Sequence, residues 1–106
     1  MENKVLGLIG LAAKAGKMAF GADSVKREIV RGRIRLLILA ENSSEKTKLK
    51  FKKIADEAKV PTIFFGTISN LSTAIGKTNK AILGITDMNL AREIKRIVYS
   101  GGDSIG

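Results

Sequence analysis

Residues 34–40 read IRLLILA, an apolar run with branched side chains that only Arg35 interrupts. A strand that is covered on both faces needs apolar side chains in both directions, so this run predicts a central β-strand. Shorter strand patterns precede it at residues 18–20 and follow it at residues 62–65 and 81–85. The sequence therefore predicts a sheet with residues 34–40 in its interior.

Helices are expected between these strands, because apolar residues there recur with the spacing of one helix face. Gly16, Gly32 and Gly76 follow three of the segments and are typical helix stops. The alternation α-β-α-β-α-β-α-β-α predicts an α/β fold with helices on both faces of the sheet. The residues expected on the buried helix faces are Val5, Leu8, Ile9 and Ala12; Val25, Ile29 and Val30; Phe51, Ile54, Ala55 and Ala58; Leu71, Ala74 and Ile75; and Leu90, Ala91, Ile94, Ile97 and Val98.

Polar residues near the helix starts are candidate N-caps, since their side chains can accept hydrogen bonds from first-turn N–H groups. For the third helix, Glu45 also stands three residues after Asn42, which is the spacing of a capping box. The candidates are Asp23 for the second helix, Asn42, Ser43 and Ser44 for the third, Ser69 for the fourth and Asp87 for the last.

The chain has 106 residues, the size of one domain. We expect residues 1–99 to form a single α/β domain and the glycine-rich residues 100–106 to form a flexible tail. Nineteen Lys and Arg residues against ten Asp and Glu residues give a formal net charge of +9. Such a basic surface attracts polyanions, so nucleic acid is the first expected partner and an anionic membrane the second. No segment resembles a membrane span or a secretory signal, which predicts a cytoplasmic protein, with a monomer as the default state.

Several residue types that carry enzyme chemistry are missing. The chain has no Cys, which excludes disulfides, a thiol nucleophile and a thiolate zinc site, and no His, the usual general base at neutral pH. It contains neither a P-loop nor a G-x-G-x-x-G motif, so we predict no catalytic residue, no metal and no cofactor. The few aromatic residues favour recognition of a structured RNA over a stacking platform for single strands.

Residues 13–27, AKAGKMAFGADSVKR, carry the strongest functional pattern. A basic turn leads through a short apolar run into a helix start, where unpaired N–H groups can hold an anion. An ordinary strand-to-helix turn with an Asp cap has a similar local sequence, but the clustered cations favour a recognition role. The candidate residues are Lys14, Lys17, Gly21, Ala22, Asp23, Ser24, Lys26 and Arg27.

Two further basic segments are weaker candidates. Gly76-Lys77-Thr78-Asn79-Lys80 offers two cations, a hydroxyl and an amide, which suit phosphate and sugar contacts. By itself this segment is equally a solvated loop, and it gains weight if the fold places it beside Gly21. The lysines of the third helix, at positions 46, 48, 50, 52 and 53, are better interpreted as a solvated face that adds diffusely to RNA affinity.

A series of segments along the chain resembles a known family. They are LIGLAAKAGKMAFGADSVKREI (8–29), RLLILAENSS (35–44), Val60-Pro61, NLSTAIGKTNKAILGITD (70–87) and a last helix that opens with Leu90-Ala91. Together they resemble the kink-turn RNA-binding ribosomal proteins, and among these the small bacterial members of the YlxQ type. The resemblance implies a three-layer α/β/α sandwich with a four-stranded mixed sheet. It also implies binding to RNA kink-turns, in which a bulge lies beside tandem sheared G·A pairs.

The resemblance further implies which residues contact RNA. The start of the second helix would enter the groove at the G·A pairs, and Arg27 would take the place of the family's following lysine. Two departures concern selectivity, because Asp23-Ser24 stands where archaeal and eukaryotic relatives have Asn-Glu, and Leu71-Ser72 where relatives often have Leu-Gly. The implied contacts are Gly21, Ala22, Asp23 and Ser24, the loop residues Ile75, Gly76, Lys77, Thr78, Asn79 and Lys80, and the polar turn from Glu41 and Asn42 to Ser44.

The leading hypothesis is a non-catalytic protein that clamps a bent, structured RNA, with ribosomal RNA as the first target and the ribosome as a partner. A second hypothesis is a ribosome-associated factor that binds ribosomal RNA generally through the lysine face at 46–53. A third is a small-molecule enzyme or sensor with a cleft at the strand ends, which the missing His and Cys disfavour. The leading hypothesis requires Asp23 and Asn79 to lie on the same side of the molecule.

Overall fold

A computed structural model describes residues 2–105 of the chain. Its four-stranded sheet has the order β1-β4-β2-β3, and β4 is antiparallel to both neighbours while β2 and β3 are parallel. The strands are β1 (Met18–Phe20), β2 (Leu36–Leu39), β3 (Thr62–Phe64) and β4 (Ile82–Ile85). The predicted central strand is β2, an inner strand with all four residues buried.

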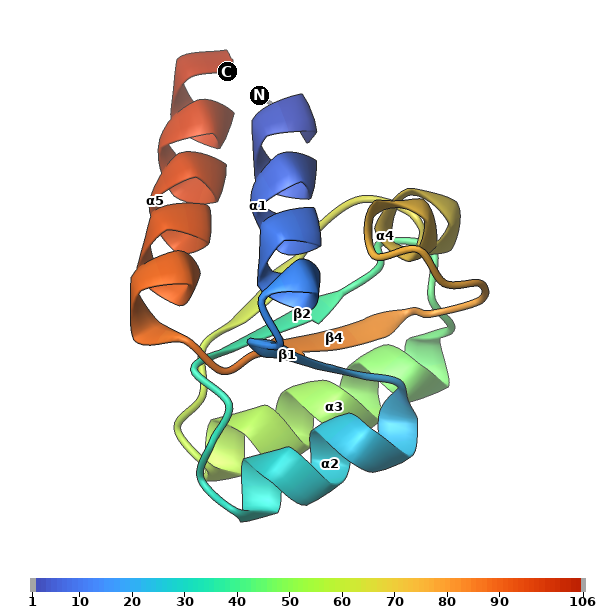
Figure 1. Ribbon diagram of the computed structural model, residues 1–106. Coiled ribbons are helices and arrows are strands. Elements are labelled where there is room, and N and C mark those ends of the chain that lie inside the picture. Colours follow the sequence, from blue (N-terminus) through green and yellow to red (C-terminus); the bar gives the residue numbers. More distant parts are fainter. Residues whose placement is uncertain (1, 106) are drawn as a thin grey trace.

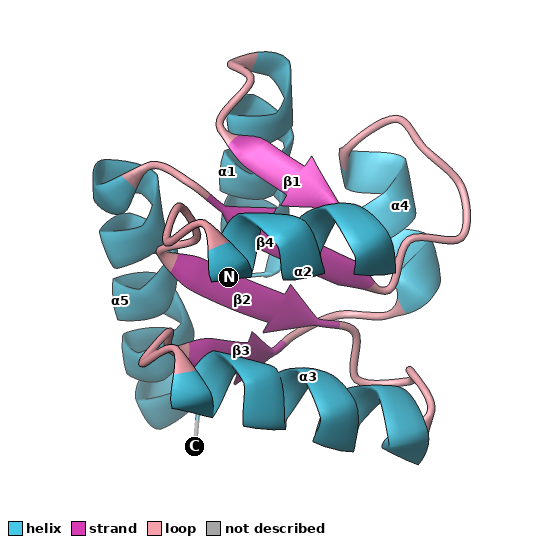
Figure 2. Cartoon of the chain, turned by 90° about the horizontal axis from the view of Figure 1, so that it is seen from below, coloured by secondary structure: helices cyan, strands magenta, loops and turns pink. Residues whose placement is uncertain are grey.

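Helices cover both faces of the sheet, as Figures 1 and 2 show. One layer consists of α1 (Glu2–Lys14), α4 (Ile68–Ala74) and α5 (Met88–Ile105), and the other of α2 (Ala22–Val30) and α3 (Glu45–Glu57). Successive side chains of β2 point to opposite faces. Leu36 and Ile38 therefore join the core under α1 and α5, whereas Leu37 and Leu39 join the core over α2 and α3. The predicted three-layer sandwich with a mixed sheet is confirmed.

The starts of α3 and α4 differ from the predicted capping. Ser44, one of three candidates, caps α3, and its hydroxyl accepts the backbone N–H of Thr47 at 3.1 Å. The predicted Asn42–Glu45 capping box is wrong, because the Asn42 side chain instead accepts the backbone N–H of Ile68 at 2.8 Å. This bond joins the end of β2 to the start of α4, a long-range contact that local spacing does not encode.

The fourth helix begins earlier than predicted. Its N-cap is Thr67, not Ser69, and Thr67 forms a reciprocal capping box with Asn70. Each side chain accepts the other residue's backbone N–H, at 3.0 Å for Thr67 Oγ1 and 3.2 Å for Asn70 Oδ1. Two first-turn donors are thereby satisfied, which fixes the start of a short helix close to the candidate site.

Two predictions for α2 are also wrong. Its N-cap is Gly21 with no side-chain cap, so Asp23 lies within the first turn rather than before it. Val30 was expected in the core but is 78% exposed. Val25 and Ile29 already occupy the buried face four residues apart, and the next residue is rotated about 100° away from them.

The last helix begins as predicted and extends further than predicted. The side chain of Asp87 accepts the backbone N–H of Leu90 at 2.9 Å, which confirms it as the cap. The helix continues through Ser100 to Ile105, where the sequence predicts a tail, and Gly106 lies outside the described residues. The flexibility of that segment stays a prediction. No helix within residues 2–105 is long and apolar enough to cross a membrane.

Candidate nucleic-acid interface

At one end of the sheet, here called the sheet edge, strands β1 and β2 end and strand β4 begins. Gly21, just after β1, donates its backbone N–H to the carbonyl oxygen of Ile82 at 2.9 Å. Ala40, just after β2, donates to the carbonyl oxygen of Ala81, also at 2.9 Å. The β1–α2 turn and the loop between α4 and β4 therefore leave the sheet at the same edge, at the right of Figure 1.

The β1–α2 turn depends on a glycine. Gly21 has φ 89° and ψ 156°, a backbone conformation that is essentially restricted to glycine. Because it caps α2 without a side chain, the first N–H groups of the helix receive no acceptor from the N-cap. Ala22 and Asp23 in this turn are exposed, and Ser24 is half-buried. The turn thus presents backbone donors and the positive end of a helix dipole at the surface.

The α4–β4 loop, residues 76–80, is held in place by a buried serine. Ser72 is 4% exposed, and its hydroxyl accepts the backbone N–H of Lys80 at 2.7 Å and donates to the Lys80 carbonyl oxygen at 3.3 Å. Asn79, just before Lys80, has a positive φ of 55°. Ser72 stood out in the sequence only as a departure from relatives, and its clamping role requires the tertiary contact.

The loop lysines gather beside Gly21. The ammonium groups of Lys77 and Lys80 lie 5.3 and 5.7 Å from the centroid of the Phe20 ring. The Lys80 ammonium is also 3.8 Å from the position that a Cβ on Gly21 would take. The two segments that the sequence analysis singled out therefore lie side by side, on the same side of the molecule (Figure 1). Phe20, whose ring lies near both loop lysines, could not be recognised as a site residue from the sequence, where it is only an apolar residue of a short strand.

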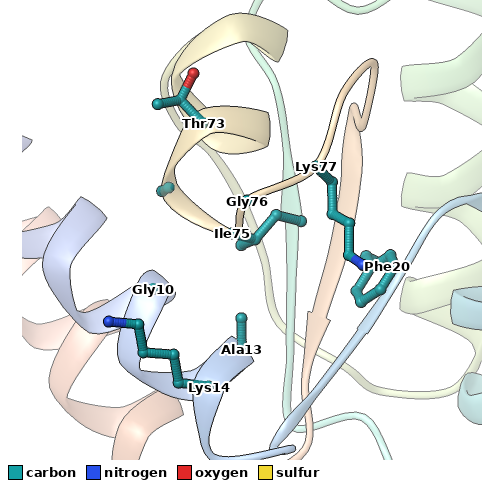
Figure 3. A pocket seen from close by; sticks show the side chains of 9 residues that line it. Gly10, Ala13, Lys14, Phe20, Thr73, Ile75, Gly76 and Lys77 are labelled. Carbon is teal, nitrogen blue, oxygen red and sulfur yellow. The ribbon is translucent and has the colours of Figure 1, made fainter.

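Two hollows flank the 76–80 loop, and Lys77 lines both. The hollow toward the end of β2 has a volume of about 460 Å³, and all but one of its lining residues are of polar type: Asn42, Ile68, Ser69, Ser72, Thr73, Lys77, Thr78 and Asn79. The groove toward α1 has a volume of about 550 Å³ and includes Lys14 (Figure 3).

Glu41, next to Asn42, is exposed and donates its backbone N–H to the Gly66 carbonyl oxygen at 2.7 Å.

The outer face of α2 continues from the turn. Asp23, Lys26 and Arg27 line a shallow depression of about 300 Å³ together with Val30 and Arg31. The side chain of Arg27 is 55% exposed, although its Nε lies 3.9 Å from a carboxylate oxygen of Glu28. That carboxylate also pairs with Arg31 at 3.1 Å and with Arg33 at 3.3 Å, so its charge is shared among three guanidinium groups.

Lys17 is the candidate that the structure does not bring to this edge. It precedes β1 at the end that pairs with Ile85, and three strand residues separate it from Gly21, a distance of about 10 Å or more. Its ammonium instead lies 3.1 Å from a carboxylate oxygen of Asp87. Two hydrogen bonds hold the pKa of the Asp87 carboxyl below its ordinary value: the one from the backbone N–H of Leu90 has the larger effect, and the one from the Lys17 ammonium has the smaller. Lys17 therefore contributes to the start of α5 and not to the candidate interface.

The described residues offer no metal centre, since no group of three or more Asp or Glu side chains among them is arranged to hold an ion. What the edge does offer is a helix start, a cationic loop and two hollows on a strongly basic protein. These are the elements of a surface for a folded polyanion.

The chain belongs to the ribosomal protein L7Ae/L30e/S12e/Gadd45 family, whose model matches residues 3–95. It is 30% identical over 97 residues to the RNA-binding protein YlxQ of Enterococcus faecium, covering 92% of this chain and 93% of that protein. It is 32% identical over 87 residues to the RNA-binding protein YlxQ of Bacillus subtilis, covering 82% and 87%. The solved structure of a protein of unknown function from Bacillus halodurans C matches with a TM-score of 0.86 and 28% identity, covering 90% of this chain and 96% of that one. The family resemblance seen in the sequence is thus confirmed.

Proposed function

We propose that this protein binds a sharply bent RNA of the kink-turn type, without catalysis, through the sheet edge that joins the Gly21–Arg27 helix start to the Ile75–Lys80 loop. The observation that carries the proposal is the approach of the Lys80 ammonium to Gly21, 3.8 Å from a Cβ position there. Family membership and relatives that are named RNA-binding proteins support the same conclusion.

The start of α2 and the 75–80 loop would contact different parts of the RNA. The start of α2 offers backbone N–H groups to phosphates, and the Asp23 carboxylate accepts from N–H groups of base edges in the widened groove of the kink. Lys77 and Lys80 neutralise phosphates of the strand that crosses the loop, and the polar hollow beside Asn42 receives a bulged nucleotide. Because only the kinked RNA contacts all these groups together, binding shifts the RNA population toward the kinked state.

The competing proposal is general binding of ribosomal RNA through the α3 lysines. Within the described residues, Lys48 pairs with Glu45 at 3.7 Å and Lys52 pairs with Asp56 at 2.8 Å. These contacts reduce the charge that α3 offers, whereas neither Lys77 nor Lys80 has a carboxylate within 4 Å among the described side chains. This difference favours the sheet edge as the RNA-binding surface. Ribosomal RNA in the cytoplasm is the proposed target, and a monomer is the proposed binding species.

The test is a titration of the protein against a kink-turn duplex and a matched duplex whose G·A pairs are disrupted. The proposal expects preference for the kink-turn duplex and a salt slope that falls by about 1 for each of Lys77→Ala and Lys80→Ala. Lys53→Ala on α3 is the matched control and should leave the slope unchanged. Equal affinity for both duplexes would refute kink recognition, and a larger effect of Lys53→Ala would favour the α3 surface. Crosslinking in cells followed by sequencing of the attached RNA would identify the natural target.

A further inference from the structure

The groove on the α1 side of the 76–80 loop has no role in the proposal above. Its volume of about 550 Å³ is in the range of sites that hold small molecules. Small residues of α1 (Gly10 and Ala13) and of the end of α4 and its loop (Ala74 and Gly76) line it. A Cβ on Gly10 would lie 2.9 Å from the Ala74 carbonyl oxygen, so this glycine lets the two helices approach closely. In Figure 3 the Phe20 ring stands at one side of the groove and α1 runs along the other.

The chemistry of the lining suits one kind of ligand. Lys14 and Lys77 both line the groove and no acidic residue does, so the groove favours an anion. Phe20 is half-buried and adds an aromatic ring, against which a nucleobase can stack. An aromatic ring beside cations is the arrangement with which proteins bind unpaired nucleotides.

The groove is also continuous with the proposed RNA interface. The 76–80 loop forms a ridge, with the polar hollow beside Asn42 on one side and this groove on the other, and Lys77 lines both. An RNA strand that passes from the hollow over the 76–80 loop would therefore enter the groove while its phosphates stay close to Lys77. The Phe20 ring directly precedes Gly21, the residue on which the other half of the interface depends.

Resting on the proposed function, we infer that this groove is a subsite for one unpaired nucleotide of the bound RNA, with its base on Phe20 and its phosphate on Lys77, while Lys14 adds positive charge at the far side of the groove. In the free protein the ammonium groups of Lys77 and Lys80 lie within 6 Å of the ring centroid. A phosphate attracts an exposed ammonium more strongly than a ring does, and a stacked base gains more than an exposed cation–π contact. The lysine ammonium groups therefore move to phosphate when RNA arrives, and the ring becomes available to the base.

The experiment uses a kink-turn RNA with a bulge of several nucleotides, in which one bulge nucleotide at a time is replaced by an abasic residue. Phe20→Leu keeps an apolar side chain and removes the ring, Phe20→Tyr keeps the ring, and Phe64→Leu removes a 41% exposed ring on β3 as the matched control. For one bulge position we expect Phe20→Leu to bind the intact RNA about tenfold more weakly than the parent protein does. It should bind the RNA that is abasic at that position as well as the parent does. Phe20→Tyr and Phe64→Leu should behave as the parent for both RNAs.

A second readout follows the base itself. 2-Aminopurine at the same bulge position should lose fluorescence on binding to the parent protein and to Phe20→Tyr, because stacking quenches it, and should keep its fluorescence with Phe20→Leu. Equal weakening of the intact and abasic RNAs by Phe20→Leu would show that the ring only supports the lysines, and would overturn the subsite. So would parent affinity of Phe20→Leu for every RNA. If the parent protein does not prefer the kink-turn RNA over its G·A-disrupted control, the proposed function fails and the subsite fails with it.

Discussion

Replacement of Ser72 by Ala should release the 76–80 loop. The Ser72 hydroxyl makes two bonds to the backbone of Lys80, at 2.7 Å to its N–H and at 3.3 Å to its carbonyl oxygen. Alanine fits the site without added volume but leaves both backbone groups without this partner. The change therefore isolates the hydrogen bonds from the packing of α4.

The size of the effect follows from the burial of the groups involved. A fully buried group that loses its partner costs about 1–3 kcal/mol. Lys80 is half-buried, so water can reach part of its backbone, and the lower part of that range applies, about 1–2 kcal/mol. For a domain of this size that corresponds to a Tm lower by about 4–8 °C. It also corresponds to roughly 5–30-fold less protection of the Lys80 amide against hydrogen exchange.

The measurement combines urea denaturation with amide hydrogen exchange followed by NMR. Thr73→Ala is the matched control, because Thr73 is the exposed neighbour on the same helix, and a surface change of this kind stays within about 0.5 kcal/mol. RNA affinity should fall for Ser72→Ala, because this change leaves the loop lysines on a loosened backbone. Thr73 lines the hollow beside Asn42, so Thr73→Ala is the control for stability and hydrogen exchange alone. Unchanged exchange of the Lys80 amide in Ser72→Ala would refute the clamp, whatever the change in Tm.

Three other predictions concern single positions. Gly21→Ala should lower the free energy of unfolding by about 1–3 kcal/mol, measured by urea denaturation, because a residue with a side chain disfavours φ 89° with ψ 156° although its Cβ has room. A loss below about 0.5 kcal/mol would contradict this backbone requirement. Gly84→Ala should lower the free energy of unfolding by about 1–3 kcal/mol, since its Cβ would lie 2.6 Å from Cδ1 of the buried Ile34. Ile34→Val removes that atom and should recover part of the loss, but not all of it, because Cγ1 and Cγ2 both lie 3.3 Å away. The Asp87 pKa is lowered by the Leu90 N–H, so its stabilising effect should be complete above about pH 5 and disappear as the pH falls through the lowered folded-state value. Asp87→Asn should flatten the stability profile in that acid range, and an unchanged profile would argue against the cap.

Much of the fold could be predicted because it is written in local patterns. The run at 34–40 became a buried inner strand, and the helix faces at Val5, Ile9 and Ala12 are buried as their spacing predicts. Asp87 caps its helix because a cap needs only neighbours along the chain. Where a distant partner competes, local spacing misleads: the Asn42 side chain bonds to Ile68 N–H, 26 residues away, instead of completing a local capping box.

The candidate site was predicted in part, and the difference has the same cause. Gly21 and the loop lysines were identified as residue types that suit an RNA surface, and so was Lys17. The predicted strand at 18–20 already placed Lys17 and Gly21 at its opposite ends, but the sequence does not tell which end meets the 76–80 loop. The extended backbone carries them apart, and Lys17 pairs with Asp87 instead. Phe20 and Ser72 were not identified as site residues, because their roles exist only through contacts with the 76–80 loop.

The amino-acid sequence alone determined the basic charge of this protein and which segments form helices and which form strands. Charge and hydrophobic period are properties of the residues and their immediate neighbours. Only the tertiary structure decided which of the cations act together. The strand order β1-β4-β2-β3 places the end of β1 beside the start of β4, so that Gly21 meets Lys80 across 59 residues of chain. That order depends on the joint packing of both helix layers onto the sheet, which no single segment specifies.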